Sequence, residues 1–253
     1  MRTTAILNLK GGVAKTVTCV NMAAILAADY GKRVLVVDAD SQANTTEFFG
    51  GAETCASTMS DLLRRLDVNA VIRTTDTERI SLIAADESLM DLDLSAVKSK
   101  EADMGCLDRL LAEHRDEYDY CLIDCPPAFN AAAAAALLAA DDVIIPIKLD
   151  AFSLRGMANL MRQVANMQTI NPNLRVAGLL PTMVYPSKQI KKALGILQMS
   201  DFNVYHTIRK TNKVDDMTFA QRPLIESSPR SAACVDYRRF VESYVLEGGA
   251  IRG

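Results

Sequence analysis

Short, continuously apolar runs alternate with longer helical patterns along most of this chain. Continuous rather than alternating apolarity is typical of strands that are covered on both faces, as in a parallel sheet. The pattern predicts strands at residues 4–9, 33–38, 80–84, 118–124, 142–146 and 176–180. Helical spacing predicts helices at residues 17–30, 57–66, 104–115, 129–139, 153–167, 187–199 and 230–246.

This regular alternation of strand and helix predicts the α/β class, with a doubly wound, mostly parallel sheet flanked by helices. No internal repeat and no linker-like stretch interrupts the pattern. We therefore expect residues 1–253 to form a single domain, with residues 248–253 as a frayed tail. Six consecutive alanines at residues 131–136 fit a helix packed closely on the sheet.

Composition narrows the class of protein. A chain of 253 residues with 49% hydrophobic content can bury a large core. No run approaches the roughly 18 apolar residues of a membrane span, and the first residues enter a strand directly, so we expect neither a membrane helix nor a signal peptide. The six cysteines form no C-x-x-C pair, which argues against a disulfide framework and a zinc site. We expect a cytoplasmic protein.

The strongest chemical signal lies between the first predicted strand and the first predicted helix, where residues 10–16 are K-G-G-V-A-K-T. Two glycines let the backbone approach phosphate oxygens, while successive N–H groups and the following helix N-terminus supply positive partial charge. In such a loop Lys15 would contact the β- and γ-phosphates, and the Thr16 hydroxyl would ligate Mg²⁺. The spacing therefore predicts a phosphate-binding loop.

Acidic side chains close two of the predicted strands. Asp38 and Asp40 end the second run, and Asp124 ends the run at 118–124 and is followed by Cys125 and two prolines. Carboxylates at the carboxyl ends of parallel strands lie where open α/β sheets bind their ligands. An acid beside the phosphate loop helps to fix the octahedral shell of Mg²⁺. The prolines restrict the loop that leaves the strand.

The loop opens with a lysine, so it has the deviant Walker A form K-G-G-x-x-K-[ST]. With D-A-D-S-Q at 38–42 and D-C-P-P at 124–127, the chain resembles the ParA/MinD family of P-loop ATPases from residue 1 to about residue 246. The resemblance implies ATP and Mg²⁺ as cofactors and an ATPase that is slow without a partner. It implies that Asp40 orients the attacking water. Because Lys15 already serves the phosphates of its own loop, we expect Lys10 to cross to the phosphates of a second subunit.

The resemblance also assigns groups of site residues. The implied catalytic residues are Lys10, Lys15 and Asp40. The implied metal-site residues are Thr16, Asp38 and Asp124. The implied nucleotide contacts are Lys10, Gly11, Gly12, Val13, Ala14, Lys15, Thr16, Val17, Asp38, Thr182, Met183, Ile208 and Lys210, the last four of them near the base.

This sequence departs from the family pattern at several of these positions. Ala14 stands where glycine is common, and it would be strained if the loop needs a positive φ there. Val17 replaces a frequent threonine whose hydroxyl would meet an α-phosphate, so binding of ATP is expected to survive but to weaken modestly. In the loop near the base, Arg209 stands where the family has proline and Thr211 where it usually has asparagine.

Three functions are compatible with this resemblance. The first is a small ParA-type partition ATPase, whose ATP-bound homodimer binds DNA without sequence preference until a ParB-type protein stimulates hydrolysis. The second is a MinD-type positioning ATPase, which needs a membrane-binding amphipathic helix, whereas this chain continues after Leu246 with Glu247 and two glycines. The third is a metabolic or redox enzyme of the same fold, such as dethiobiotin synthetase or the nitrogenase iron protein. We favour the first, nucleoid-associated and with no membrane partner.

Charge along the chain favours a DNA surface near its end. The net charge is −3, but the segment from Lys188 onward contains 11 Lys and Arg against 7 Asp and Glu, a net of +4. Local surfaces, rather than the overall charge, determine phosphate contacts. The expected DNA contacts are Lys188, Lys192, Lys213 and Arg222. No aromatic residues are interleaved with them in the pattern, so we expect no base stacking.

Overall fold

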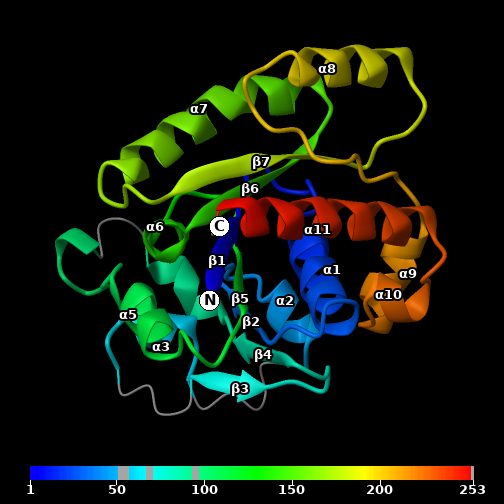
Figure 1. The fold of residues 1–253 in the computed structure, drawn as a ribbon. Coiled ribbons are helices and arrows are strands. Elements are labelled where there is room, and N and C mark those ends of the chain that lie inside the picture. The colour runs from blue at the N-terminus through cyan, green and yellow to red at the C-terminus, as the bar shows by residue number, and fades with distance from the viewer. Residues whose placement is uncertain (51–56, 67–70, 93–96, 252–253) are drawn as a thin grey trace.

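One seven-stranded sheet organises the protein, with the strand order β3-β4-β2-β5-β1-β6-β7 (Figure 1). The computed structural model describes residues 1–50, 57–66, 71–92 and 97–251. Its strands are β1 (Arg2–Ile6), β2 (Val34–Asp38), β3 (Ile72–Thr74), β4 (Ile80–Ile83), β5 (Tyr120–Asp124), β6 (Asp142–Lys148) and β7 (Arg175–Thr182). Neighbouring strands are parallel except for the antiparallel pair β3–β4. The predicted α/β, mostly parallel class is confirmed.

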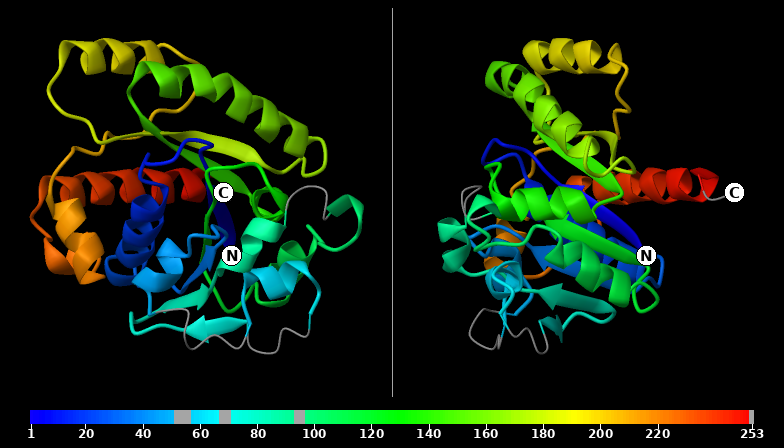
Figure 2. Two further views of the ribbon diagram at one scale, coloured as in Figure 1. Left: turned by 180° about the vertical axis from the view of Figure 1, so that it is seen from behind. Right: turned by 90° about the vertical axis from the view of Figure 1, so that its left-hand side faces the viewer.

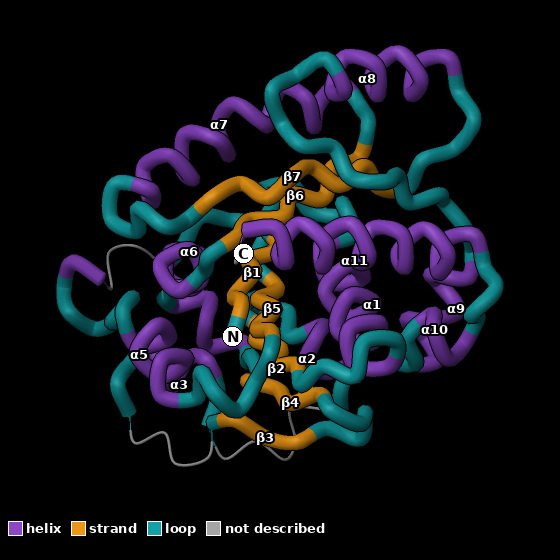
Figure 3. Tube along the Cα trace, in the orientation of Figure 1, coloured by secondary structure: helices purple, strands orange, loops and turns teal. Residues whose placement is uncertain are grey.

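Helices cover both faces of the sheet, so the strands lie in the middle of the molecule (Figures 2 and 3). The helices are α1 (Lys15–Ala28), α2 (Asn44–Phe48), α3 (Met59–Leu63), α5 (Cys106–Glu113), α6 (Ala131–Ala139), α7 (Ala151–Gln168), α8 (Lys188–Gln198), α9 (Lys213–Ala220), α10 (Leu224–Ser227) and α11 (Ala232–Ile251), with a 3₁₀ turn η2 (Glu87–Asp91). Side chains of α3, α5, α6, α7 and α8 share one core with the sheet. Those of α1, α9, α10 and α11 share the other.

Small and large side chains fill these two cores in different ways. The alanines at 131–136 are at most 1% exposed in α6, which confirms a helix packed closely on the sheet. On the opposite face α11 buries Tyr237, Phe240 and Tyr244, which are among the largest fully buried side chains. Alternate residues of each strand point to opposite faces, so every central strand must be apolar on both sides.

Several predicted boundaries were wrong, mostly in short elements. The first strand ends at Ile6 rather than at residue 9, and the helix predicted at 57–66 is reduced to α3. The helix predicted to end at residue 246 continues through Gly248 and Gly249 to Ile251, although glycine costs about 1 kcal/mol in a helix. β3, α2, α9 and α10 were not predicted, because segments of three to eight residues give too little periodic signal.

Candidate functional site

The phosphate loop joins β1 to α1, and two of its residues have left-handed backbone conformations. Gly12 and Ala14 both have φ of 68°, and α1 begins directly after them at Lys15. No side chain among the described residues caps this helix, so its first N–H groups remain open for a ligand. A run of such N–H groups forms a concave anion site, which the helix N-terminus reinforces.

Ala14 adopts the positive φ at which an alanine is strained. A left-handed alanine costs roughly 1–2 kcal/mol relative to its usual conformations. Val17, the second departure in the loop, is half-buried and lines a cavity of about 240 Å³ together with Thr16, Phe48 and Met217. The loop therefore keeps the geometry of a phosphate cradle although its sequence departs at two positions.

Two acids meet at the carboxyl edge of the sheet, because β2 and β5 are neighbours. Asp38 and Asp124 are paired in register and are 0% and 1% exposed. One oxygen of Asp124, Oδ2, accepts hydrogen bonds from Thr16 Oγ1 at 2.6 Å and from Thr45 Oγ1 at 2.7 Å. The other, Oδ1, is buried and has no hydrogen-bond partner among the described residues.

Asp38 has a different environment. Its Oδ2 accepts hydrogen bonds from the Thr46 amide and hydroxyl, both at 2.8 Å, and its Oδ1 accepts one from the Asp40 amide at 3.1 Å. Thr46 Oγ1 in turn accepts a hydrogen bond from the Ala85 amide. Asp38 therefore holds the segment that carries Asp40, while the carboxylate with an open oxygen is that of Asp124.

Burial makes this acidic cluster electrostatically unfavourable without a cation. Burial raises the pKa of Asp38, and the neighbouring charge of Asp124 raises it further. Burial also raises the pKa of Asp124, although hydrogen bonds from Thr16 and Thr45 and the charge of Lys15 act in the opposite direction. Lys15 is itself buried, at 7% exposure. A divalent cation beside Thr16 and Asp124 would stabilise both ionised carboxylates, so the donor set fits Mg²⁺.

Asp40, the predicted water-orienting residue, follows Asp38 in a tight turn. Its Oδ1 accepts a hydrogen bond from the Gln42 amide at 3.1 Å, and its carbonyl accepts one from the Ala43 amide at 2.9 Å. Ala43 is a second left-handed alanine, with φ of 51°. The turn places Asp40 at 9% exposure beside the cluster of Asp38 and Asp124.

The two lysines of the loop point to different partners. The Nζ of Lys15 stays within the loop and donates a long hydrogen bond to the Lys10 carbonyl at 3.5 Å. The Nζ of Lys10 instead donates to both carboxylate oxygens of Asp150, at 2.9 and 2.8 Å. Asn8 supports this arrangement, because its side chain accepts from the Lys10 amide and donates to the Pro146 carbonyl. Asp150 was not predicted, although it follows a strand and directly precedes α7.

The four residues predicted near the base lie on two adjoining segments. Thr182 ends β7 and donates from Oγ1 to the Val13 carbonyl at 3.0 Å, so β7 is tied to the phosphate loop. Met183 has φ of 54°. Ile208 and Lys210 donate from their amides to the Pro181 and Val184 carbonyls. The structure thus ties the end of β7 to the loop and places the segment of Ile208 and Lys210 beside β7.

Arg209, the departure from the family proline, has a structural partner. Its amide, Nε and Nη2 all donate to Asp236 of α11, at 2.8–3.0 Å. His206 also lies at 3.2 Å from this carboxylate. The loop is therefore anchored to α11 by a charged side chain rather than by a proline ring.

The four predicted DNA contacts lie on two separate surfaces. Lys188 and Lys192 are exposed on α8, whereas Lys213 and Arg222 are exposed on α9 and on the turn after it. Figures 1 and 2 show α8 stacked above α7 and far from α9. Lys213 pairs with Asp216, and Arg222 with Glu226. Phe219, between them in the chain, is 92% exposed, and this aromatic residue was not predicted.

Comparisons with known proteins agree with this geometry. The family described as "AAA domain" (AAA_31) matches residues 1–176. The chain is 32% identical to the sporulation initiation inhibitor protein Soj of Bacillus subtilis, over 96% of this chain and 98% of that protein. It is 35% identical to the chromosome partitioning protein ParA of Caulobacter vibrioides, over 72% and 70% of the two chains.

Among solved structures, cobyrinic acid a,c-diamide synthase from Mycobacterium smegmatis, with bound ADP and magnesium, matches with a TM-score of 0.82. It is 26% identical, and the match covers 98% of this chain and 96% of that one. Within the part of this chain that the structure describes, no helix is long and apolar enough to cross a membrane.

Proposed function

Because this chain belongs to the ParA/MinD family of P-loop ATPases, we propose that it is a small ParA-type partition ATPase. ATP with Mg²⁺ binds at residues 10–17, two subunits dimerise around it, and the dimer holds DNA until hydrolysis. The observation that carries this proposal is the open, buried Oδ1 of Asp124 beside Thr16 and the two-lysine phosphate loop.

Each residue of the site has a distinct task in this proposal. The loop N–H groups and Lys15 bind the phosphates, and Thr16 and Asp124 hold Mg²⁺, with Asp38 fixing the segment beside them. When bound, Mg²⁺ neutralises charge that develops on the transferred phosphoryl group. Asp40 orients the attacking water. The anchored segment 38–46 then changes its contacts after the γ-phosphate leaves, which couples hydrolysis to release.

Lys10 is the residue that makes dimerisation part of catalysis. Lys15 already serves the phosphates of its own loop, so a second lysine is surplus within one subunit. In a face-to-face dimer Lys10 reaches the phosphates of the partner subunit and stabilises negative charge there. It must first exchange its two hydrogen bonds with Asp150 for the phosphates. Dimerisation thus replaces an internal ion pair with an intersubunit one.

DNA binding in this proposal uses the exposed basic residues of two surfaces. Lys188 and Lys192 on one surface, and Lys213 and Arg222 on the other, contact phosphates without reading sequence. A dimer presents twice as many contacts, so nucleotide state changes DNA affinity without any new type of contact. A ParB-type protein would stimulate hydrolysis and release the dimer from the nucleoid.

DNA retention measured with ATP, with ADP and without nucleotide tests the proposal. We expect retention only with ATP, falling steeply as salt rises. Lys213→Glu and Arg222→Glu should weaken binding and flatten the salt dependence, while Arg162→Glu, which changes an exposed arginine on α7, should not. ATPase activity of all three variants serves as the control for folding. Wild-type protein that never binds DNA would overturn the partition function.

A parallel measurement with anionic lipid vesicles separates the alternative functions. The continuation of α11 to Ile251, with Leu246 67% exposed, is the observation that favours a MinD-type membrane function. Retention on vesicles but not on DNA would support that function. Retention on neither would leave a metabolic enzyme of the same fold, the class to which the cobyrinic acid a,c-diamide synthase structure belongs.

A further inference from the structure

A second pocket lies at the edge of the sheet opposite the phosphate loop. It has a volume of about 460 Å³, within the range of about 300–1,000 Å³ that small-molecule sites occupy. β1 and β5 begin beside it, and the same strands end at the phosphate loop and at Asp124. Its lining includes Arg2, Lys32, Arg33, Arg115, Tyr118 and Tyr120.

The pocket contains more positive than negative charge. Four of its side chains are basic, and two, Asp116 and Asp119, are acidic. Asp119 is already engaged, because it accepts a hydrogen bond from the Arg33 amide at 2.8 Å and lies 3.5 Å from Arg33 Nε. The charge of Lys32 also acts on Asp119 and helps to lower the pKa of that carboxyl. Among the described residues, neither Lys32 nor Arg115 has an acidic group within 4 Å.

Arg2, in the wall of the pocket, is a buried arginine whose charge is held by the fold. Its side chain is 7% exposed and lies with its guanidinium carbon 3.8 Å from the centre of the Tyr244 ring. Its Nε donates to Asp142 Oδ2 at 2.6 Å, and its Nη1 donates to the Tyr244 carbonyl at 3.0 Å. Its Nη2 is buried without a hydrogen-bond partner in the described part of the chain.

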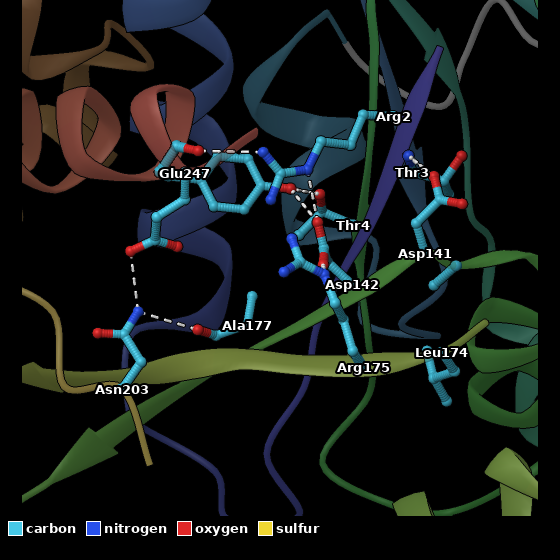
Figure 4. A network of polar contacts seen from close by, with 12 residues as sticks. Arg2, Thr3, Thr4, Asp141, Asp142, Leu174, Arg175, Ala177, Asn203 and Glu247 are labelled. Carbon is cyan, nitrogen blue, oxygen red and sulfur yellow. Dashed lines mark hydrogen bonds and ion pairs between the residues drawn. The ribbon is translucent and has the colours of Figure 1, made fainter. Parts of the chain in front are cut away.

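The buried carboxylate of Asp142 balances this guanidinium. Asp142 is shared, because Arg175 Nε lies 2.5 Å from its Oδ1, so one buried carboxylate faces two arginines (Figure 4). Tyr244 Oη donates a further hydrogen bond to Asp142 Oδ2. Glu247 accepts hydrogen bonds from Asn203 and Tyr205 instead. The Arg175 side chain is 42% exposed, so solvent screens its charge, and the buried ion pair is that of Arg2 with Asp142.

We propose that this pocket binds a small phosphate-bearing molecule, distinct from the nucleotide at the phosphate loop. Guanidinium groups recognise phosphate oxygens through paired hydrogen bonds, and Lys32 adds a point charge. Tyr118, Tyr120 and Val245 supply an aromatic and apolar wall for the body that carries the phosphate. Because neither the loop lysines nor the acids of the first site take part, the second site does not depend on the proposed ATPase function.

Titration calorimetry with inorganic phosphate and with pyrophosphate tests this site. The Lys15→Ala background removes the loop lysine, so saturable binding that remains there reports on the pocket. Adding Lys32→Ala and Arg115→Ala should weaken that binding at least tenfold. The matched pair Lys98→Ala and Arg162→Ala removes the same charges from exposed positions elsewhere and should leave it unchanged. Tyrosine emission gives a second readout, since the chain has no tryptophan.

The outcomes separate this site from the proposed function. Saturable binding that depends on Lys32 and Arg115 in the Lys15→Ala background supports the pocket, whether or not the wild type binds ATP. No saturable binding in that background overturns it. Equal weakening by the pocket pair and by the control pair also overturns it, because the effect would then be one of net charge.

Discussion

The two edges of the central sheet differ in the signs and the partners of their buried charged side chains. At the carboxyl edge, three buried acids, Asp38, Asp40 and Asp124, lie in one cluster with one buried lysine, Lys15, whose charge acts on Asp124. At the amino edge, one buried acid lies between two arginines. Among the described residues, the first edge has one buried carboxylate oxygen without a hydrogen-bond partner, Asp124 Oδ1. The second edge has two such atoms, Arg2 Nη2 and Asp142 Oδ1, but Asp142 Oδ1 lies 2.5 Å from Arg175 Nε.

The buried charges at the amino edge stabilise the fold, whereas those at the carboxyl edge become favourable only when a cation binds. Asp142 ties β6 to β1, β7 and α11, because Arg2, Arg175 and Tyr244 all contact it. Asp124 and Asp38 instead stand beside each other with raised pKa values, which is unfavourable until a cation arrives. Substituting the acids at the two edges should therefore have opposite effects on stability.

The largest expected effect is at the amino edge. Asp142→Ala leaves Arg2 and the network around it without a carboxylate, and breaking a buried ion pair in this way costs about 3–5 kcal/mol. Urea unfolding without nucleotide measures this loss. Asp201→Ala, which removes an exposed carboxylate, is the matched control and should change stability by less than about 0.5 kcal/mol. A loss below about 1 kcal/mol for Asp142→Ala would contradict the structural role of this charge.

At the carboxyl edge, Asp124→Asn should separate stability from ligand binding. An asparagine oxygen can still accept from Thr16 and Thr45, and the repulsion of Asp38 disappears, so the ligand-free protein should be as stable as wild type or more so. Wild type should gain about 2.7 kcal/mol from a ligand at 100 times its Kd. The Asp124→Asn variant should lose most of the increase in the free energy of unfolding that ADP with Mg²⁺ provides. Thermal unfolding with and without both ligands measures the two effects.

A smaller effect, on ATP-dependent dimerisation, is expected from substituting Asp150, which holds Lys10 within its own subunit. Asp150→Asn weakens the internal ion pair, so Lys10 is more readily available to a second subunit. The concentration of ATP needed for half-maximal dimerisation should fall by about three- to tenfold, equivalent to about 1 kcal/mol. Light scattering across an ATP series measures it.

The companion variant Lys10→Ala should bind ATP but neither dimerise nor hydrolyse it. If Lys10→Ala still dimerises with ATP, the role of Lys10 in the partner subunit is wrong. If Asp150→Asn needs as much ATP as wild type, the internal ion pair does not oppose dimerisation.

The smallest effect should come from Ala14→Gly. The change relieves roughly 1–2 kcal/mol of left-handed strain, but the added freedom of glycine in the unfolded chain offsets about 0.5–1 kcal/mol of it. A net gain of about 0.5 kcal/mol should raise the Tm by about 1–2 °C for a chain of this length. Ala112→Gly on the exposed side of α5 should lower the Tm, which provides a control of opposite sign.

Much of the site could be predicted because its parts follow strand ends. The phosphate loop follows β1, Asp38 ends β2 and Asp124 ends β5, so a parallel sheet brings all three to one edge. Asp150 ends no predicted strand, and its partner lies 140 residues away. A pairing over that distance has no signature in local sequence, and only the adjacency of β1 and β6 brings it about.

The sequence by itself determined the α/β class, the central parallel strands and the phosphate loop, because these depend on local apolar runs and short-range spacing. The tertiary structure decided which charges share partners. It placed Asp142 between Arg2 and Arg175, directed Lys10 to Asp150 and separated the basic residues of α8 from those of α9. Such relations depend on how distant strands and helices pack, since ion pairs and hydrogen bonds act over only a few ångströms.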